Sequence, residues 1–457
     1  MDHLNSLQAL RAFFDSGGTR DYRFRAEQLR SLRASVVRNE KKIFDALYTD
    51  LKKVPEECWF TENGFVLQDL NYAIRNLRSW MKPRSAGTNL ANMPSSSFQL
   101  PDPKGVVLVI GPWNFPFQLT LVPVAGAVAA GNCVVVKPSE LAPATAAITE
   151  EVIRESFSPE HVQVVQGDGA TVVPNLMGSF RFDHVFYTGS TKVGRSIYEM
   201  AARDLIPVTL ELGGKDPCVI ESDAHLPSAA RRIALGKFTN AGQMCVSPDY
   251  LLIHRSVKER FMPLLIESIR SMYTDQPEQA YGYNKIIHER HFDRLVGFLS
   301  QGRVVYGGTH DRTRLFIAPT ILEDVPLDAP VMNDEIFGPI LPVYTFSERE
   351  EALAIIRRNP DPLSFYIFTR NRATEANWFR SVRSGNAGVN TTALQCANHH
   401  LPFGGVGSSG IGAYHGRYSF DVFTHFRSVM RTPTWFDPSI KYPPLKGRMK
   451  LFKFLMR

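Results

Sequence analysis

Val106-Val107-Leu108-Val109-Ile110 is an unbroken apolar run, and Gly111-Pro112-Trp113-Asn114-Phe115-Pro116 follows it directly. A short apolar run bounded by turn residues is typical of a strand buried on both faces of a parallel sheet. Further runs of this kind alternate with helix-like segments: Val134 to Val136, His161 to Val165, His184 to Tyr187 and Val208 to Leu210. This alternation predicts an α/β fold in which crossover units build a parallel sheet.

A second alternation follows between Tyr250 and Asn390. Its apolar runs include Tyr250 to His254, Leu341 to Thr345 and Ser364 to Phe368. We therefore expect a second α/β domain. From Leu4 to about Trp80 apolar residues recur three and four positions apart, which predicts a layer of helices. The Pro-, Ser- and Gly-rich stretch from Pro83 to Pro101 predicts an arm or hairpin outside the main core.

Composition sets limits on the class of protein. The chain has 457 residues, of which 44% are hydrophobic and 21% are charged, as expected for a folded protein of two or three domains. The formal net charge is +7, but Lys and Arg are dispersed, so we do not expect a nucleic-acid partner. The chain has neither a run of about eighteen apolar residues nor a signal-peptide pattern. We expect a cytoplasmic protein.

The five cysteines are Cys58, Cys133, Cys218, Cys245 and Cys396. Their number is odd and no two form a Cys-x-x-Cys pair, so neither a disulfide framework nor a metal site is indicated. Cys245 stands out because Asn240-Ala-Gly-Gln-Met-Cys245-Val-Ser-Pro places it at the transition between a helix and a strand. Glu211 lies upstream in Leu210-Glu211-Leu-Gly-Gly-Lys215. A thiol and a carboxylate in two such turns suggest a nucleophile served by a base.

Each of these residues has a structural alternative. An unpaired cysteine is commonly a small buried apolar residue, and Glu211 could be a structural acid paired with Lys215. Asn114 could be a turn residue rather than a hydrogen-bond donor to a substrate. Thr188-Gly189-Ser190 ends one strand and opens a helix, where phosphate can bind, although such junctions also use Gly and Ser only to cap.

Six segments in the same order resemble the aldehyde dehydrogenase superfamily from about Pro101 to His425. They begin at Gly111, Lys137, Thr188, Leu210, Asn240 and Glu335, and Pro402-Phe403-Gly-Gly-Val-Gly407 extends the match. Tyr414-His415-Gly416 and the Tyr442-Pro-Pro ending are most similar to the class 3 branch, which includes fatty and aromatic aldehyde dehydrogenases. The resemblance implies oxidation of an aldehyde to a carboxylic acid with NAD or NADP.

The resemblance also implies roles for individual residues. Cys245 would be the nucleophile, Glu211 the general base and Asn114 an oxyanion donor. The coenzyme would contact Lys137, Glu140, Thr188, Gly189, Ser190, Gly194, Glu335 and Phe337. Trp113, Tyr187, Met244 and Phe403 suggest an apolar, aromatic-lined substrate pocket, which favours medium or long aliphatic or aromatic aldehydes.

The domain limits follow the same pattern. We expect an NAD(P)-binding domain in 1–82 and 104–209, a catalytic domain in 210–408, an oligomerisation arm in 83–103 and 409–435, and a basic amphipathic tail in 436–457. The arm implies a homodimer. In the tail Met449, Leu451, Phe452, Leu455 and Met456 would share one helix face. Lys446, Lys450, Lys453 and Arg457 lie opposite, so the tail would either touch an anionic membrane or dock on the dimer.

Two rival functions and two departures remain. An acylating enzyme would pass the thioester to coenzyme A, but relatives of that kind generally lack a Glu at the position of Glu211. A non-catalytic protein that retains the fold is the other rival. The segment Cys58-Trp-Phe-Thr-Glu-Asn63 lacks the usual Ser-Glu pair, and Asn390-Thr-Thr differs from the commoner Asn-Asp. We expect both departures to change channel or interface contacts rather than the chemistry.

Overall fold

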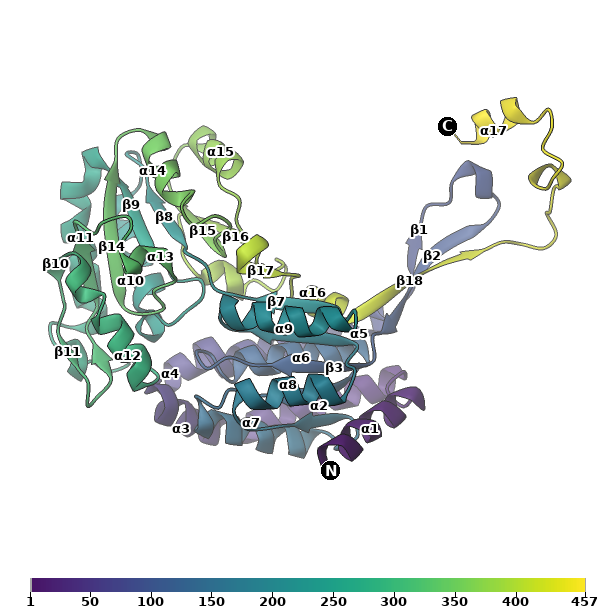
Figure 1. Ribbon diagram of the computed structural model, residues 1–457, viewed down its shortest axis with the longest axis horizontal. Coiled ribbons are helices and arrows are strands. Elements are labelled where there is room, and N and C mark those ends of the chain that lie inside the picture. The colour runs from purple at the N-terminus through teal and green to yellow at the C-terminus, as the bar shows by residue number, and fades with distance from the viewer. Residues whose placement is uncertain (1, 457) are drawn as a thin grey trace.

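Two α/β bodies lie side by side and a β-ribbon projects from one of them (Figure 1). The structure is a computed structural model, and it describes the backbone of residues 2–456 and the side chains of residues 5–456. The predicted α/β class with two parallel sheets is confirmed.

The first sheet has the strand order β17-β7-β6-β3-β4-β5. Its parallel strands are β3 (Val106–Ile110), β4 (Cys133–Lys137), β5 (Val162–Val164), β6 (His184–Thr188) and β7 (Val208–Glu211). The short strand β17 (Gly410–Ile411) adds antiparallel to β7. All five predicted apolar runs are therefore strands, within a residue or two of the expected limits.

Helices cover both faces of this sheet, which explains why β3 is apolar at every position. Val107 and Val109 face one core, whereas Val106, Leu108 and Ile110 face the other. The first core contains α2 (Tyr22–Arg38), α3 (Glu40–Leu51), α5 (Gly64–Trp80), α6 (Gln118–Ala130) and α7 (Pro143–Ser156). The second contains α1 (Asp2–Asp15), α8 (Gly169–Ser179) and α9 (Thr191–Arg203). The predicted N-terminal helices thus form part of the body that contains the first sheet.

The second sheet has the order β10-β13-β14-β9-β8-β15-β16 and is parallel except for β10. Its strands are β8 (Pro217–Ile220), β9 (Tyr250–His254), β10 (Arg303–Tyr306), β13 (Thr320–Glu323), β14 (Ile340–Phe346), β15 (Ser364–Phe368) and β16 (Asn386–Val389). On one face lie α10 (Leu226–Phe238) and α11 (Lys258–Tyr273). On the other lie α12 (Glu289–Val296), α14 (Arg349–Ile356) and α15 (Arg372–Ser381).

The ribbon is a three-stranded antiparallel sheet that extends away from the body (Figure 1). It consists of β1 (Arg84–Ala86), β2 (Ser96–Pro103) and β18 (Thr424–Arg431), so both strands between residues 83 and 103 lie in the ribbon. The segment 409–435, which we assigned to the arm as one unit, is divided. Strand β17 joins the first sheet and α16 (Arg417–Val422) packs on α6, because Ser419 and Phe420 are buried there; only β18 enters the ribbon.

The tail folds back near the tip of the ribbon and ends in the short helix α17 (Met449–Leu455) (Figure 1). Met449 and Met456 are exposed, whereas Leu451, Phe452 and Leu455 are half-buried. The predicted cation Arg457 lies outside the described residues. Between residues 2 and 456, no helix is both long enough and apolar enough to span a bilayer.

Candidate active site

Cys245 lies in the loop between α10 and β9, as the flanking pattern predicts. The loop is sharply bent, because Asn240, Ala241 and Gly242 all have positive φ values of 52°, 50° and 72°. Only glycine fits at position 242, where a Cβ atom would overlap the carbonyl group of Gly338. The Cys245 loop is therefore held against the turn that follows Glu335.

A cavity of about 650 Å³ opens in front of this thiol. Cys245, Met244 and Phe403 line it, together with Trp59, Phe60, Phe65, Phe115 and Leu119. Trp113 and Tyr187, which we expected in the same pocket, are not among its lining residues. Trp113 packs edge-on against Phe337 with ring centroids 5.1 Å apart, and the Tyr187 hydroxyl lies beside the Ser190 carbonyl at 3.4 Å. Both side chains thus pack beside the turns that carry Phe337 and Ser190.

Glu211 is the last residue of β7 and is 3% exposed. Both of its carboxyl oxygens are buried, and neither has a hydrogen-bond partner within the described part of the chain. Burial raises the pKa of this carboxyl group well above its ordinary value. The alternative partner Lys215 instead forms a buried ion pair with Asp249 at 2.6 Å, so the structural pairing of Glu211 with Lys215 is wrong.

Burial also raises the pKa of the Cys245 thiol well above its ordinary value. The neighbouring Cys396 thiol and the carboxyl groups of Glu335, Asp216 and Glu211 add to this shift, because each negative charge disfavours a thiolate. The thiol is therefore protonated at neutral pH in this state. A thiol in this state must lose its proton before its sulfur can act as a nucleophile.

Asn114 lies between β3 and α6 and is 4% exposed. Its backbone carbonyl accepts two hydrogen bonds, from Asn240 Nδ2 at 2.9 Å and from Lys53 Nζ at 3.1 Å. The first bond joins the Asn114 turn directly to the loop that bears Cys245. Asn114 is thus more than an isolated turn residue, and its peptide is fixed relative to the thiol loop.

The expected coenzyme residues gather at the carboxyl ends of the parallel strands, where open α/β sheets bind nucleotides. Lys137 ends β4, is almost completely buried and pairs with Glu140. The other Glu140 oxygen accepts a hydrogen bond from the Gly169 amide at 3.2 Å. The pair is therefore set at a helix start rather than on an open surface, and its ammonium and carboxylate suit a ribose diol.

Thr188 ends β6, and Ser190 caps α9 by accepting a hydrogen bond from the Val193 amide. A Cβ atom at Gly189 would overlap the Tyr187 hydroxyl, and one at Gly194 would overlap the Leu212 side chain. Both glycines allow the helix start to approach the strand closely. This opening of α9 has the free amides and dipole that favour a pyrophosphate.

Glu335 and Phe337 lie on a turn that the second body presents to the first. His291 Nε2 lies 2.7 Å from the Phe337 carbonyl, and Arg294 hydrogen-bonds the Ile336 and Glu335 carbonyls. Phe337 has a φ of 54°, a left-handed conformation that these contacts from α12 maintain. Sequence reasoning missed His291 and Arg294, because they are distant in the chain and their bonds go to backbone atoms.

Tyr414 and His415 also line the cavity, although their sequence served only to mark the branch of the family. His415 has a φ of 79° and stacks on Phe403 with centroids 5.2 Å apart. Burial lowers the pKa of His415 to about 4, so the ring is neutral at physiological pH. The positive φ of His415, which is uncommon for a residue other than glycine, marks this position, and the sequence alone does not show it.

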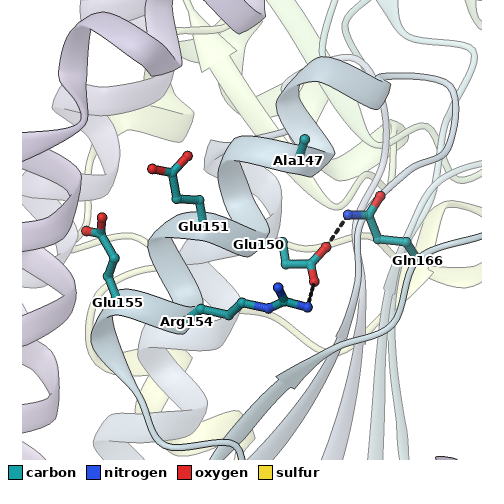
Figure 2. A pocket seen from close by; sticks show the side chains of 6 residues that line it. All are labelled: Ala147, Glu150, Glu151, Arg154, Glu155 and Gln166. Carbon is teal, nitrogen blue, oxygen red and sulfur yellow. Dashed lines mark hydrogen bonds and ion pairs between the residues drawn. The ribbon is translucent and has the colours of Figure 1, made fainter.

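A separate hollow of about 410 Å³ lies on the outer side of α7 (Figure 2). Its carboxylates are used in surface contacts: Glu150 binds Arg154 and Gln166, Glu151 binds Lys42, and Glu155 binds Arg38. These contacts tie α7 to α2 and α3, so we assign this hollow no chemistry. In residues 2–456 no group of three His, Cys, Asp or Glu side chains is arranged to hold a metal ion.

The thiol, the unpaired carboxyl group and the two-sheet scaffold agree with the class of enzyme that the sequence resemblance implies. The sequence pattern of the "Aldehyde dehydrogenase family" matches residues 6–429, and the chain belongs to this family. It is 42% identical to "Aldehyde dehydrogenase family 3 member H1" of Arabidopsis thaliana, over 99% of this chain and 94% of the relative.

Two further comparisons agree with this assignment. "Aldehyde dehydrogenase, dimeric NADP-preferring" of Canis lupus familiaris is 40% identical over 97% of this chain and 98% of the relative. A solved structure of Staphylococcus aureus AldH in a substrate-bound state superposes with a TM-score of 0.96 at 40% identity and covers 99% of both chains. The chain is thus an aldehyde dehydrogenase similar to family 3 members. It oxidises aldehydes to carboxylic acids with NAD or NADP.

Proposed function

We propose that this enzyme oxidises medium- or long-chain aliphatic or aromatic aldehydes and hydrolyses the resulting thioester. The observation that carries the proposal is the Glu211 carboxyl group, which is buried, has no hydrogen-bond partner among residues 5–456 and helps to raise the pKa of the Cys245 thiol. The cavity supports the substrate class, because its volume of about 650 Å³ is in the range of small-ligand sites and its wall is mostly apolar.

In this proposal the Cys245 thiol releases its proton to solvent water and its sulfur attacks the aldehyde carbon. The carbonyl oxygen becomes an oxyanion, which the Asn114 amide and the Cys245 backbone N–H stabilise. A nicotinamide held by Glu335 and Phe337 would supply the acceptor for the hydride of the thiohemiacetal carbon. Glu211 then removes a proton from water, the hydroxyl attacks the thioester carbon, and the cysteine sulfur departs as the carboxylate forms.

The coenzyme residues have matching roles. Lys137 and Glu140 would bind the adenosine ribose, and the Thr188-Gly189-Ser190 turn would bind the pyrophosphate. Gly194 would permit the close approach of α9. Glu335 would bind the nicotinamide ribose, with Phe337 beside the ring. Support for these roles comes from the gathering of these residues at strand ends and at one turn of the second body.

A panel of aldehydes of increasing chain length, with and without coenzyme A, tests the function. We expect NAD(P)H and free carboxylic acid to form in equal amounts, with coenzyme A changing neither. Coenzyme A-dependent turnover with an acyl-CoA product would instead favour the acylating alternative. A protein that binds coenzyme but forms no NAD(P)H with any aldehyde would favour the non-catalytic alternative.

We also propose a homodimer in the cytoplasm. The ribbon β1-β2-β18 leaves strand edges and the apolar side chains Leu90, Met93 and Met430 exposed, and such edges gain from pairing. The canine relative is named dimeric. All five cysteines are free thiols in the structure, which suits a reducing compartment.

For the tail, exposed Met449 and Met456 beside Lys450 and Lys453 suit either a dimer surface or an anionic membrane. Cosedimentation with anionic vesicles, comparing the full chain with one that ends at Pro444, separates these two partners. Salt-sensitive binding that requires the tail would support the membrane. Equal binding by both proteins, or binding by neither, would eliminate the membrane role of the tail.

A further inference from the structure

Lys53 and Glu62 form an ion pair beneath the Asn114 turn. The Lys53 Nζ and Glu62 Oε1 atoms are 2.6 Å apart, and neither side chain has any exposed area. Glu62 lies in the π-helix η1 (Trp59–Asn63), which joins α4 (Pro55–Cys58) to α5. Burying two charges has a high desolvation cost, and an apolar pair of similar volume often stabilises a core equally well. Packing alone therefore does not account for the pair.

The remaining hydrogen-bonding capacity of both side chains is directed to one segment, residues 114–118. Lys53 Nζ donates to the Asn114 carbonyl at 3.1 Å, and Glu62 Oε2 accepts from the Gln118 amide at 2.8 Å. Gln118 is the first residue of α6, whose N-cap residue Phe117 makes no side-chain cap. Glu62 therefore caps this helix from another element, where a negative charge also suits the helix dipole.

Lys53 also contacts the middle of the segment, because its Nζ lies 3.8 Å from the centre of the Phe115 ring. The Asn114 carbonyl in addition accepts from Asn240 Nδ2 at 2.9 Å. One carbonyl oxygen thus joins the ion pair, the Asn114 turn and the thiol loop. Its two donors fix the plane of the peptide that follows Asn114, and hence the direction in which the Asn114 side chain leaves the backbone.

We propose that Lys53 and Glu62 are positioning residues for the oxyanion donor, acting on the reaction only through the Asn114 turn. This inference rests on the proposed role of Asn114. An oxyanion donor works because it is held in place before charge develops, and a small displacement removes most of its effect. Breaking the ion pair should therefore weaken transition-state stabilisation much more than coenzyme binding.

A double-mutant cycle with Asn114→Ala tests the proposal. We expect Lys53→Met to lower kcat/KM for the aldehyde by about 10- to 100-fold, a part of the loss typical for an oxyanion donor. The dissociation constant for NAD should change by less than about twofold, since the coenzyme turns are untouched. In an Asn114→Ala background the same substitution should lower kcat/KM by less than about threefold, because the group it positions is already absent.

Glu62→Gln is the second variant, since it keeps the shape and an acceptor for the Gln118 amide and is the better candidate to fold. The matched control is Arg25→Met, because Arg25 is a buried cation that donates to the Ala129 carbonyl at the other end of α6. Arg25→Met should lower the unfolding temperature and leave kcat/KM of the folded enzyme within about twofold.

Equal losses from Lys53→Met with and without the Asn114 side chain would overturn the inference and show a purely structural pair. Wild-type kcat/KM in both Lys53→Met and Glu62→Gln would also overturn it. If Asn114→Ala alone retains full activity, the proposed role of Asn114 fails, and the positioning role fails with it. If Asn114→Ala loses activity and the Lys53 and Glu62 variants do not, only this inference fails, and the proposed role of Asn114 stands.

Discussion

Gly213 and Glu335 meet so closely that a Cβ atom on the glycine would overlap the carboxyl group of the glutamate. Gly213 comes two residues after Glu211 in the first body, and Glu335 belongs to the second, so this contact sets the spacing between the turn after Glu211 and the turn that we propose binds the nicotinamide ribose. The glycine is required here for lack of space, not for a left-handed backbone.

Gly213→Ala should displace Glu335 and disturb the nicotinamide end of the coenzyme site. We expect KM for NAD to rise about tenfold or more and kcat to fall, as steady-state kinetics would show. Gly178→Ala is the matched control, because nothing lies within 4 Å of the added atom in α8. That variant should keep wild-type kinetics and gain up to about 1 kcal/mol of stability. Unchanged kinetics in Gly213→Ala would contradict the role of Glu335.

Cys245→Ala should abolish turnover while leaving NAD affinity within about twofold, because it removes the nucleophile and no coenzyme contact. Cys396→Ala is the control, since Cys396 lines the same cavity and is also a free thiol. We expect it to retain turnover within about tenfold. Turnover kinetics and NAD fluorescence titration measure the two effects. Comparable activity in Cys245→Ala and the wild type would eliminate the nucleophile assignment.

Glu211→Gln should still release a burst of NAD(P)H and then turn over slowly, because hydride transfer precedes the step that needs a base. Burial raises the pKa of Glu211, and a base acts in its ionised form, so wild-type kcat should rise with pH and level off at a higher pH than an ordinary carboxyl group would give. Stopped-flow and steady-state pH profiles should show this limb in the wild type and not in the variant. Full steady turnover by Glu211→Gln would contradict the assignment.

Glu140→Gln should shift coenzyme use toward NADP. Glu140 pairs with Lys137 and is partly exposed, so its charge repels a 2′-phosphate that Lys137 would otherwise attract. We expect the ratio of kcat/KM for NADP to that for NAD to rise about tenfold, or roughly 1.4 kcal/mol. Glu150→Gln on the outer side of α7 is the control and should leave this ratio unchanged. A shift toward NAD in Glu140→Gln would contradict the site.

Met430→Asp should weaken the dimer, because Met430 is a half-exposed apolar side chain on the edge strand β18. Light scattering at micromolar concentration should give the dimer mass for the wild type and a lower average mass for the variant. Val304→Asp is the control, because this half-exposed residue lies on β10, at the opposite end of the molecule from the ribbon (Figure 1), and this variant should remain dimeric. A monomeric wild-type protein would refute the proposed assembly.

Much of the fold is determined locally by the sequence. The runs in β3, β4 and β6 could be predicted because both faces of these strands are buried, which requires apolar residues at every position. The patterns that single out Cys245 and Glu211 are equally local, because Gly242 stands three residues before the thiol and Gly213 two residues after the carboxyl group. Patterns of this kind depend on residues within one turn or one strand, so they are visible without the rest of the molecule.

Tertiary structure alone decided which distant groups meet. Lys53 and Glu62 lie in the stretch of sequence that predicts helices, where charged residues are common. Only the packing of η1 against the Asn114 turn buries these two side chains together. The pairing of Lys215 with Asp249 rather than Glu211, and the division of 409–435 between the first sheet and the ribbon, depend likewise on which surfaces come into contact. The local spacing of residues specifies strands, helices and turns. The partner of a buried charge is specified by the whole fold, because a desolvated charge must pair with a group that the packing brings within reach.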